Sequence, residues 1–168
     1  GFPIGRIVLA LNENKMIKDF IDGDQWEKRE TIQTLANAMD VGNASNMERL
    51  TSLFSHEDIQ RNISATSISD DEIKNEIIRS FHEQNIILCP HSSTASCAYQ
   101  SLDKDIKTED WVIVATAHPA KFETIVEPLI ERKVNIPDEL KSILNKPNHF
   151  YRIKPSLKEF RELSNKYL

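Results

Sequence analysis

Residues 111–122, WVIVATAHPAKF, join an apolar run to the start of a helix. The run is nearly continuous and rich in β-branched residues, which is typical of a parallel strand covered on both faces. Thr116 follows at the carboxyl end of this predicted strand, and Pro119 suits the first turn of a helix, where an amide hydrogen is not needed. Because ligands of open α/β sheets bind at the carboxyl ends of strands, the stretch predicts an α/β fold with Thr116 as a candidate ligand contact.

Two further apolar runs, residues 6–11 and 85–89, have the same character. Helical patterns separate the three runs, and strands that alternate with helices indicate βα units and a parallel sheet. We therefore predict a partial parallel sheet with core strands at about 6–11, 85–89 and 111–115, flanked by helices and followed by a helical tail over residues 137–168. No repeat or linker-like stretch interrupts the sequence, so we expect residues 1–168 to form a single unit.

Helix starts are predicted by S-x-x-E patterns at Ser45, Ser69 and Ser156. In such a capping box, the serine and glutamate side chains pair with backbone amides that the first turn leaves free. After Ser69, apolar residues recur every four positions, which predicts a helix with one face toward the core. Residues 56–68 show no clear pattern, and their structure is left open.

The composition narrows the class of protein. With 168 residues, 39% hydrophobic and 28% charged, the chain has the size and balance of an ordinary globular domain. Its net charge of -5 does not favour nucleic-acid binding, which leaves a basic footprint. It has no run of the roughly 18 to 20 apolar residues that a membrane helix needs, and two cysteines suit a reducing compartment. We expect a cytoplasmic protein that binds neither nucleic acid nor membrane.

The polar residues around Thr116 can be explained either by local structural roles or by functional ones. Its hydroxyl could donate a hydrogen bond to a ligand ring atom or accept one from it, or it could bond nearby backbone ahead of the helix. His118 is held extended by the following proline and could serve as an acid, a base or a helix cap. Lys121 suits a solvated face and does not by itself predict a Schiff base.

A second polar stretch, NAMDVGNASN at residues 37–46, leads into a predicted helix. Helix starts bind anions through their free amides, so a phosphate group could dock near Ser45 and Asn46. The alternative is a polar turn that only begins the helix.

The cysteines and histidines do not predict a metal site. Cys89, His91 and Cys97 match no common zinc spacing, and Cys89 ends an apolar run as a small buried hydrophobe would. Zinc at Cys89 and His91 is kept as a minor alternative. The sequence also lacks the glycine-rich phosphate loops and the nucleophile motif that would mark common enzyme classes.

Three motifs together resemble threonine synthases, which are pyridoxal-phosphate enzymes. They are ATAHPAKF (115–122), TLANAMDVGNASN (34–46) and LCPHSSTA (88–95), in the same order as in the family, and the similarity extends to both ends of the chain. The resemblance implies the tryptophan-synthase-β-like fold type II. It also implies the conversion of O-phosphohomoserine and water into L-threonine and phosphate, with pyridoxal 5'-phosphate as cofactor.

The resemblance also assigns roles to single residues. It implies that the hydroxyl of Thr116 hydrogen-bonds the pyridine nitrogen of the cofactor. A hydroxyl does not force that nitrogen to stay protonated, so the ring is a moderated electron sink. Further side chains would lie on the substrate side or near the cofactor: His91, His118, Asn37, Asn43 and Ser45. Two positions depart from the family pattern, because Cys89 replaces a usual acidic residue and Ala44 a usual proline.

The resemblance finally predicts that catalytic parts lie elsewhere. In this family the Schiff-base lysine and the loop that holds the cofactor phosphate lie upstream of the segment that matches residues 1–4. We therefore expect a carboxyl-terminal portion of such an enzyme, with no catalytic residue of its own and inactive alone, whose partner is the missing amino-terminal part. Gly1 agrees with a removed helix, since glycine commonly closes helices, although a natural or tag-derived start is the alternative. A stand-alone binding or regulatory module derived from the enzyme fold is the competing hypothesis.

Overall fold

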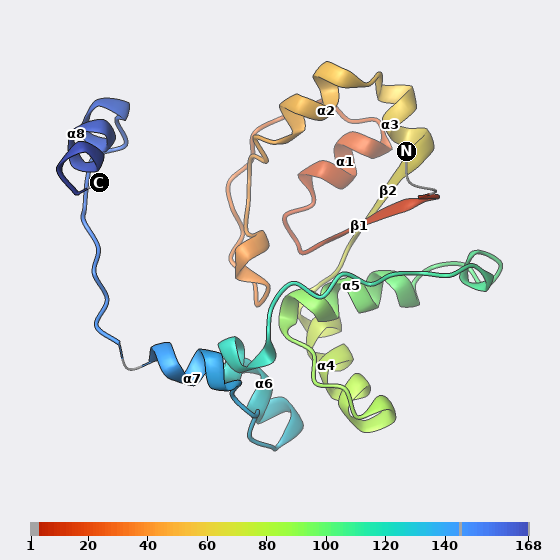
Figure 1. Cartoon of the computed structure of the whole chain (residues 1–168). Coiled ribbons are helices and arrows are strands. Elements are labelled where there is room, and N and C mark those ends of the chain that lie inside the picture. The colour runs from red at the N-terminus through yellow and green to blue at the C-terminus, as the bar shows by residue number, and fades with distance from the viewer. Residues whose placement is uncertain (1–3, 145, 168) are drawn as a thin grey trace. The chain divides into compact units, whose positions relative to one another are not determined.

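The computed structural model of the protein describes residues 4–144 and 146–167 (Figure 1). By its internal contacts the chain divides into two compact units, Gly1–Asn135 and Ile136–Leu168, where the sequence analysis expected one. The division falls next to residue 137, where the helical tail was predicted to begin.

The sheet of the first unit is a pair of parallel strands, β1 (Ile7–Leu11) and β2 (Ile63–Ser67). They lie side by side with Ile7 opposite Ile63 and Leu11 opposite Ser67 (Figure 1). Parallel strands cannot be joined by a tight turn and need a longer crossover connection. The connection here consists of α1 (Met16–Asp22), η1 (Asn37–Met39), α2 (Met47–Leu53) and α3 (His56–Asn62).

The second half of this unit is helical. Its elements are α4 (Asp70–Gln84), α5 (Pro90–Gln100), η2 (Ile106–Thr108), η3 (Pro119–Phe122) and α6 (Glu123–Ile130). Helix α4 packs against both α5 and α6. Ile73 and Ile77 of α4 are fully buried, as is Val126 of α6, so the predicted apolar face of α4 is confirmed as core.

The predicted strands need correction, although the α/β class with a parallel sheet and flanking helices is confirmed. Residues 85–89 and 111–115 form no strand. Among the described residues neither run pairs with a neighbouring strand, and a strand requires such pairing, whatever its side-chain pattern. Val112 and Val114 are 86% and 67% exposed as a result. Strand β2 lies instead within residues 56–68, for which no structure was predicted. Its sequence, ISATS, consists mostly of small residues and lacks the apolar run by which the other strands were predicted.

The predicted helix starts are confirmed at Ser69 and wrong at Ser45. The Ser69 hydroxyl accepts from the Glu72 amide at 3.4 Å, and the Ser69 amide donates to the Glu72 carboxylate at 2.8 Å. The Ser69 hydroxyl also donates to the Glu72 carboxylate at 2.6 Å, and this bond, together with that from the Ser69 amide, holds the pKa of Glu72 below its usual value. Helix α2 begins only at Met47, its cap residue Asn46 makes no side-chain cap bond, and Ser45 is exposed.

The second unit contains α7 (Asp138–Leu144) and α8 (Leu157–Tyr167), so helices form in the predicted tail. Ser156 accepts from the Glu159 amide at 3.2 Å at the start of α8, as its S-x-x-E pattern predicts. The Tyr151 and Tyr167 rings stack with centroids 4.4 Å apart. In the part of the chain that the structure describes, no helix is long and apolar enough to cross a bilayer.

Replacing Ser69 with alanine should lower the free energy of unfolding by about 1 kcal/mol, because the Glu72 amide loses the hydroxyl that caps α4. Ser45→Ala is the matched control and should change it by less than about 0.5 kcal/mol, since Ser45 caps no helix. Urea denaturation measures both. Equal losses in the two variants would contradict the assignment of the caps.

Candidate functional site

A buried polar cluster lies where β1 ends. The side chain of Asn12 is 1% exposed, and its Nδ2 donates to Asp40 Oδ1 at 2.7 Å and to Thr34 Oγ1 at 2.8 Å. The backbone carbonyl of Asn12 accepts from the Ser67 hydroxyl at the end of β2 at 2.8 Å. The cluster therefore fixes residues 34–40 to the carboxyl end of the parallel pair, the edge at which α/β sheets bind ligands.

Asp40 organises the same loop internally. Its Oδ2 accepts from the Thr34 amide at 3.0 Å and its Oδ1 accepts from the Thr34 hydroxyl at 2.7 Å. The Leu35 amide donates to Asp70 Oδ1 at 2.9 Å, which ties the loop to the start of α4. Residues 34–40 are thus held from two sides although little of the segment is helical.

Gly42 allows a close crossing of two backbone segments beside this cluster. The Arg29 amide donates to the Gly42 carbonyl at 2.9 Å, and the Gly42 amide donates to the Thr31 hydroxyl at 3.1 Å. A Cβ atom at position 42 would lie 2.2 Å from the Arg29 carbonyl oxygen. The glycine of the MDVG motif is therefore required by close approach of the backbone.

His91, near the start of α5, brings the three sequence motifs together. The residue is 7% exposed, its Nε2 accepts from the Ala38 amide at 3.1 Å, and its ring centroid lies 4.9 Å from that of Phe122. Burial lowers the pKa of His91, against the opposing effect of Asp40, and Lys121 lowers it further. The ring is therefore held as a neutral acceptor between the loop of residues 34–46 and η3.

The other predicted site residues are on the surface. Thr116 is exposed at the end of the unpaired run 111–115. His118 is exposed, and its Nδ1 accepts from the Ala120 amide at 3.1 Å, so it caps η3. The remaining candidates in the loop are also exposed: Asn37, Asn43 and Ser45. Among the described residues, no side-chain hydrogen bond joins Thr116 to His91 or to this loop.

The two cysteines belong to helix α5: Cys89 is its N-cap residue, and Cys97 lies within it. Cys89 is buried, and its sulfur accepts from the Ser92 amide at 3.4 Å, as a helix cap does. Burial, with the nearby carboxylates Glu76 and Glu72, raises the pKa of Cys97 to about 12. The described residues contain no group of three or more His, Cys, Asp or Glu placed to hold a metal ion.

Sequence analysis missed Asn12, Thr34 and Asp40 as members of the cluster. A signal was present, because Asn12 directly follows the first apolar run, in the same position relative to its strand as Thr116 was expected to occupy. Asp40 lies within the quoted loop motif, but its buried partner lies 28 positions earlier in the chain.

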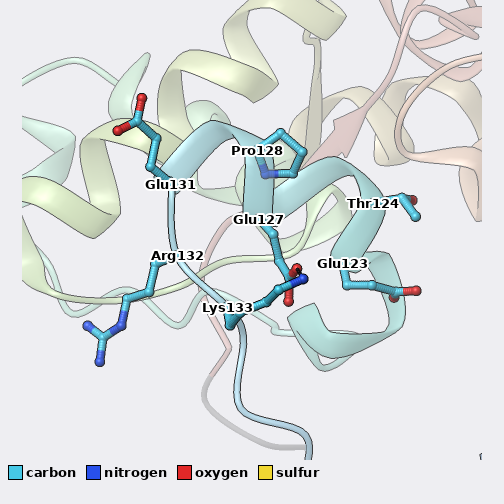
Figure 2. Close-up of a pocket in the computed structure, with 7 residues that line it drawn as sticks. All are labelled: Glu123, Thr124, Glu127, Pro128, Glu131, Arg132 and Lys133. Atoms are coloured by element: carbon cyan, nitrogen blue, oxygen red, sulfur yellow. Dashed lines mark hydrogen bonds and ion pairs between the residues drawn. The ribbon is translucent and has the colours of Figure 1, made fainter.

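A hollow of about 510 Å³ lies along α6 and the turn after it (Figure 2). There Glu127 and Lys133 point toward one another, with an N–O distance of 2.6 Å, and Glu127 also accepts from the Val134 amide at 3.0 Å. None of the predicted site residues lines it. A smaller hollow, of about 90 Å³, adjoins the polar cluster and is lined in part by Asn14 and Gly42.

Solved structures share this fold. The chain is similar to the crystal structure of threonine synthase from Escherichia coli, with a TM-score of 0.82 and 26% identity over 100% of this chain and 39% of that chain. It also resembles a pyridoxal-phosphate-bound threonine synthase from Brucella melitensis, with a TM-score of 0.79 and 23% identity over 99% of this chain and 41% of that one. The fold is therefore that of one part of these larger α/β enzymes.

The amino-acid sequence agrees with the fold. Residues 92–163 match the family model described as "Threonine synthase, C-terminal". The chain is 32% identical to threonine synthase of Escherichia coli over 141 residues, which is 83% of this chain and 32% of the relative. It is 29% identical to threonine synthase of Buchnera aphidicola subsp. Schizaphis graminum over 164 residues, 96% of this chain and 37% of the relative.

In sequence as in fold, the chain is thus related to the carboxyl-terminal portion of threonine synthases, and the resemblance predicted from its motifs is confirmed. It spans about a third of the length of the curated relatives it matches.

The Asn12–Asp40 contact yields a pH-dependent prediction. Asn12→Asp places a second carboxylate at a hydrogen-bond distance of 2.7 Å from Asp40, and like charges raise the pKa of at least one of the pair. When folding raises the pKa of a carboxyl group, its contribution to the free energy of unfolding is fully present below the unfolded pKa. That contribution is lost as pH rises through the folded pKa. The variant should therefore lose about 3 kcal/mol at pH 8 and recover part of it toward pH 4.

Asn12→Leu is the control for that experiment, because it removes the same hydrogen bonds without adding a charge. Urea denaturation of both variants and the unaltered chain at several pH values gives the free energies of unfolding. If the two variants lose the same free energy of unfolding at every pH, then Asp40 is not a charged neighbour of position 12.

Proposed function

We propose that this chain supplies the cofactor-ring contact of a pyridoxal-phosphate-dependent threonine synthase, which converts O-phosphohomoserine and water into L-threonine and phosphate. Its relationship to threonine synthases supports the activity. The exposed position of Thr116, within the ATAHPAKF motif, is the observation that carries the residue assignment.

The described residues fit the cofactor at this position. Thr116 has its side chain open to a ligand. A threonine hydroxyl can donate to an unprotonated pyridine nitrogen and can accept from a protonated one, so it suits the ring in either state. When bound, the cofactor supplies an electron sink for bonds at the substrate Cα, and the protein adjusts its strength through the partner of the ring nitrogen.

Other residues of the chain act by shaping the surroundings of that contact. His118 caps η3 and so fixes the backbone that leaves Thr116. The loop of residues 34–46, anchored by Asn12, borders the substrate side, where Asn37, Asn43 and Ser45 present exposed polar groups. A polar, hydrogen-bonding loop of this kind suits a substrate that carries an amino acid and a phosphate group.

The lysine that binds the cofactor and the loop that holds its phosphate come, in this proposal, from polypeptide outside these 168 residues. The chain by itself is then inactive. The exposed apolar side chains of Val112 and Val114 favour this arrangement over a stand-alone binding module, because contiguous exposed apolar surface marks a face that another segment covers.

The proposal is tested by Thr116→Val in an active protein that contains this chain together with the lysine-bearing part. The variant should lower kcat/KM by about 10- to 100-fold, because one hydrogen bond to the ring nitrogen is lost. Thr116→Ser keeps a hydroxyl and should retain most of the activity. The visible absorbance of the lysine-bound cofactor should persist in both, since the lysine is untouched. Full activity of the valine variant would remove Thr116 from the site.

A further inference from the structure

His91 makes contacts in two directions from the first turn of α5. On one side its Nε2 accepts from the backbone amide of Ala38 at 3.1 Å. On the other its ring lies against Phe122, the last residue of η3, with centroids 4.9 Å apart and ring planes 49° apart. The loop and η3 are therefore linked through one imidazole, although residues 38 and 122 are far apart in the sequence.

The hydrogen bond from Ala38 fixes the chemical state of the ring. A nitrogen that accepts a hydrogen bond carries no proton, so His91 must be neutral with its hydrogen on Nδ1. Nδ1 is buried and has no hydrogen-bond partner among the described residues. The ring is thus anchored through Nε2 and through its face against Phe122.

The segments that His91 joins are those that carry the proposed function. Ala38 lies within residues 34–40, which Asn12 and Asp70 hold at the end of the sheet. Phe122 ends η3, and η3 follows Thr116 in the same motif. A shift of the His91 ring would change the spacing between the two.

We propose that His91 is a positioning residue that sets the loop of residues 34–46 at a fixed distance from the segment carrying Thr116. It acts through the Ala38 amide and the Phe122 ring and does not touch the reacting atoms. The link to Thr116 rests on the proposed function, whereas the coupling of the two segments rests on the contacts alone.

The coupling depends on pH in a defined direction. Charged groups that face the ring are Asp40 from the loop and Lys121 from η3. Burial is the main cause of the lowered pKa of His91, Lys121 lowers it further, and Asp40 opposes both. When the pKa of a histidine is lower in the folded state than in the unfolded state, its contacts stabilise the fold fully above the unfolded-state pKa of about 6.5. This stabilisation is lost as pH falls through the folded-state pKa. Acidification should therefore weaken the hydrogen bond from the Ala38 amide.

Two substitutions at this one position separate the roles of the ring nitrogens. His91→Gln keeps a side-chain oxygen at the reach of Nε2, whereas His91→Asn is too short to accept from Ala38. Amide hydrogen exchange of the full chain, corrected for intrinsic exchange rates, is the measurement. The asparagine variant should lower the protection of the Ala38 amide, and of the Lys121 amide that bonds His118 within η3, by about tenfold.

The glutamine variant should retain the Ala38 protection within about threefold, and its protection should not fall between pH 7 and pH 5 as that of the unaltered chain does. Protection at Ile77, in the core of α4, reports global unfolding and should fall by no more than that of Ala38 in the asparagine variant. Loss at Ala38 with none at Lys121 would overturn the coupling. Because no cofactor is needed, this result is independent of the Thr116 experiment.

Discussion

The hydrogen bond from Asn12 to Asp40 is the interaction on which the rest of the site depends. It joins the end of β1 to residues 34–40, a loop with little regular structure of its own. The Asn12 residue that makes the bond is only 1% exposed. An amide and a carboxylate in such surroundings are stable only when their hydrogen-bonding groups are matched, so the loop can take few positions that satisfy both. The order of residues 34–40 therefore follows from β1 and not from any propensity of the loop itself.

That dependence orders the remaining contacts. Once the loop is fixed, the Ala38 amide is presented to His91, and His91 in turn lies against Phe122. Asp70 and Gly42 act as further supports, one by tying the loop to α4 and the other by letting two backbone segments cross closely. Polar contacts at the end of the sheet thus arrange groups that come from three separate motifs.

How much of this could be predicted from the sequence depended on whether the signal was local. The cap at Ser69 and the buried face of α4 were predicted correctly, because both follow from residues within a few positions of each other. Strands were predicted less well, since β2 has small polar residues and is a strand only because β1 lies beside it. The apolar runs at 85–89 and 111–115 have a side-chain pattern that suits a strand. Neither forms one, because no strand pairs with them among the described residues. His91 was singled out through family resemblance, but its link between Ala38 and Phe122 is a long-range contact that no local pattern contains.

The unpaired run that begins at Trp111 also has a consequence for the behaviour of the protein at high concentration. A bare, β-branched backbone edge is a template on which a second molecule can add a strand, and addition can repeat without limit. Glu109 and Asp110 stand directly before the run and are exposed. Stacking copies in register would bring these carboxylates together at the strand spacing of about 4.8 Å, and their mutual repulsion would oppose such stacking.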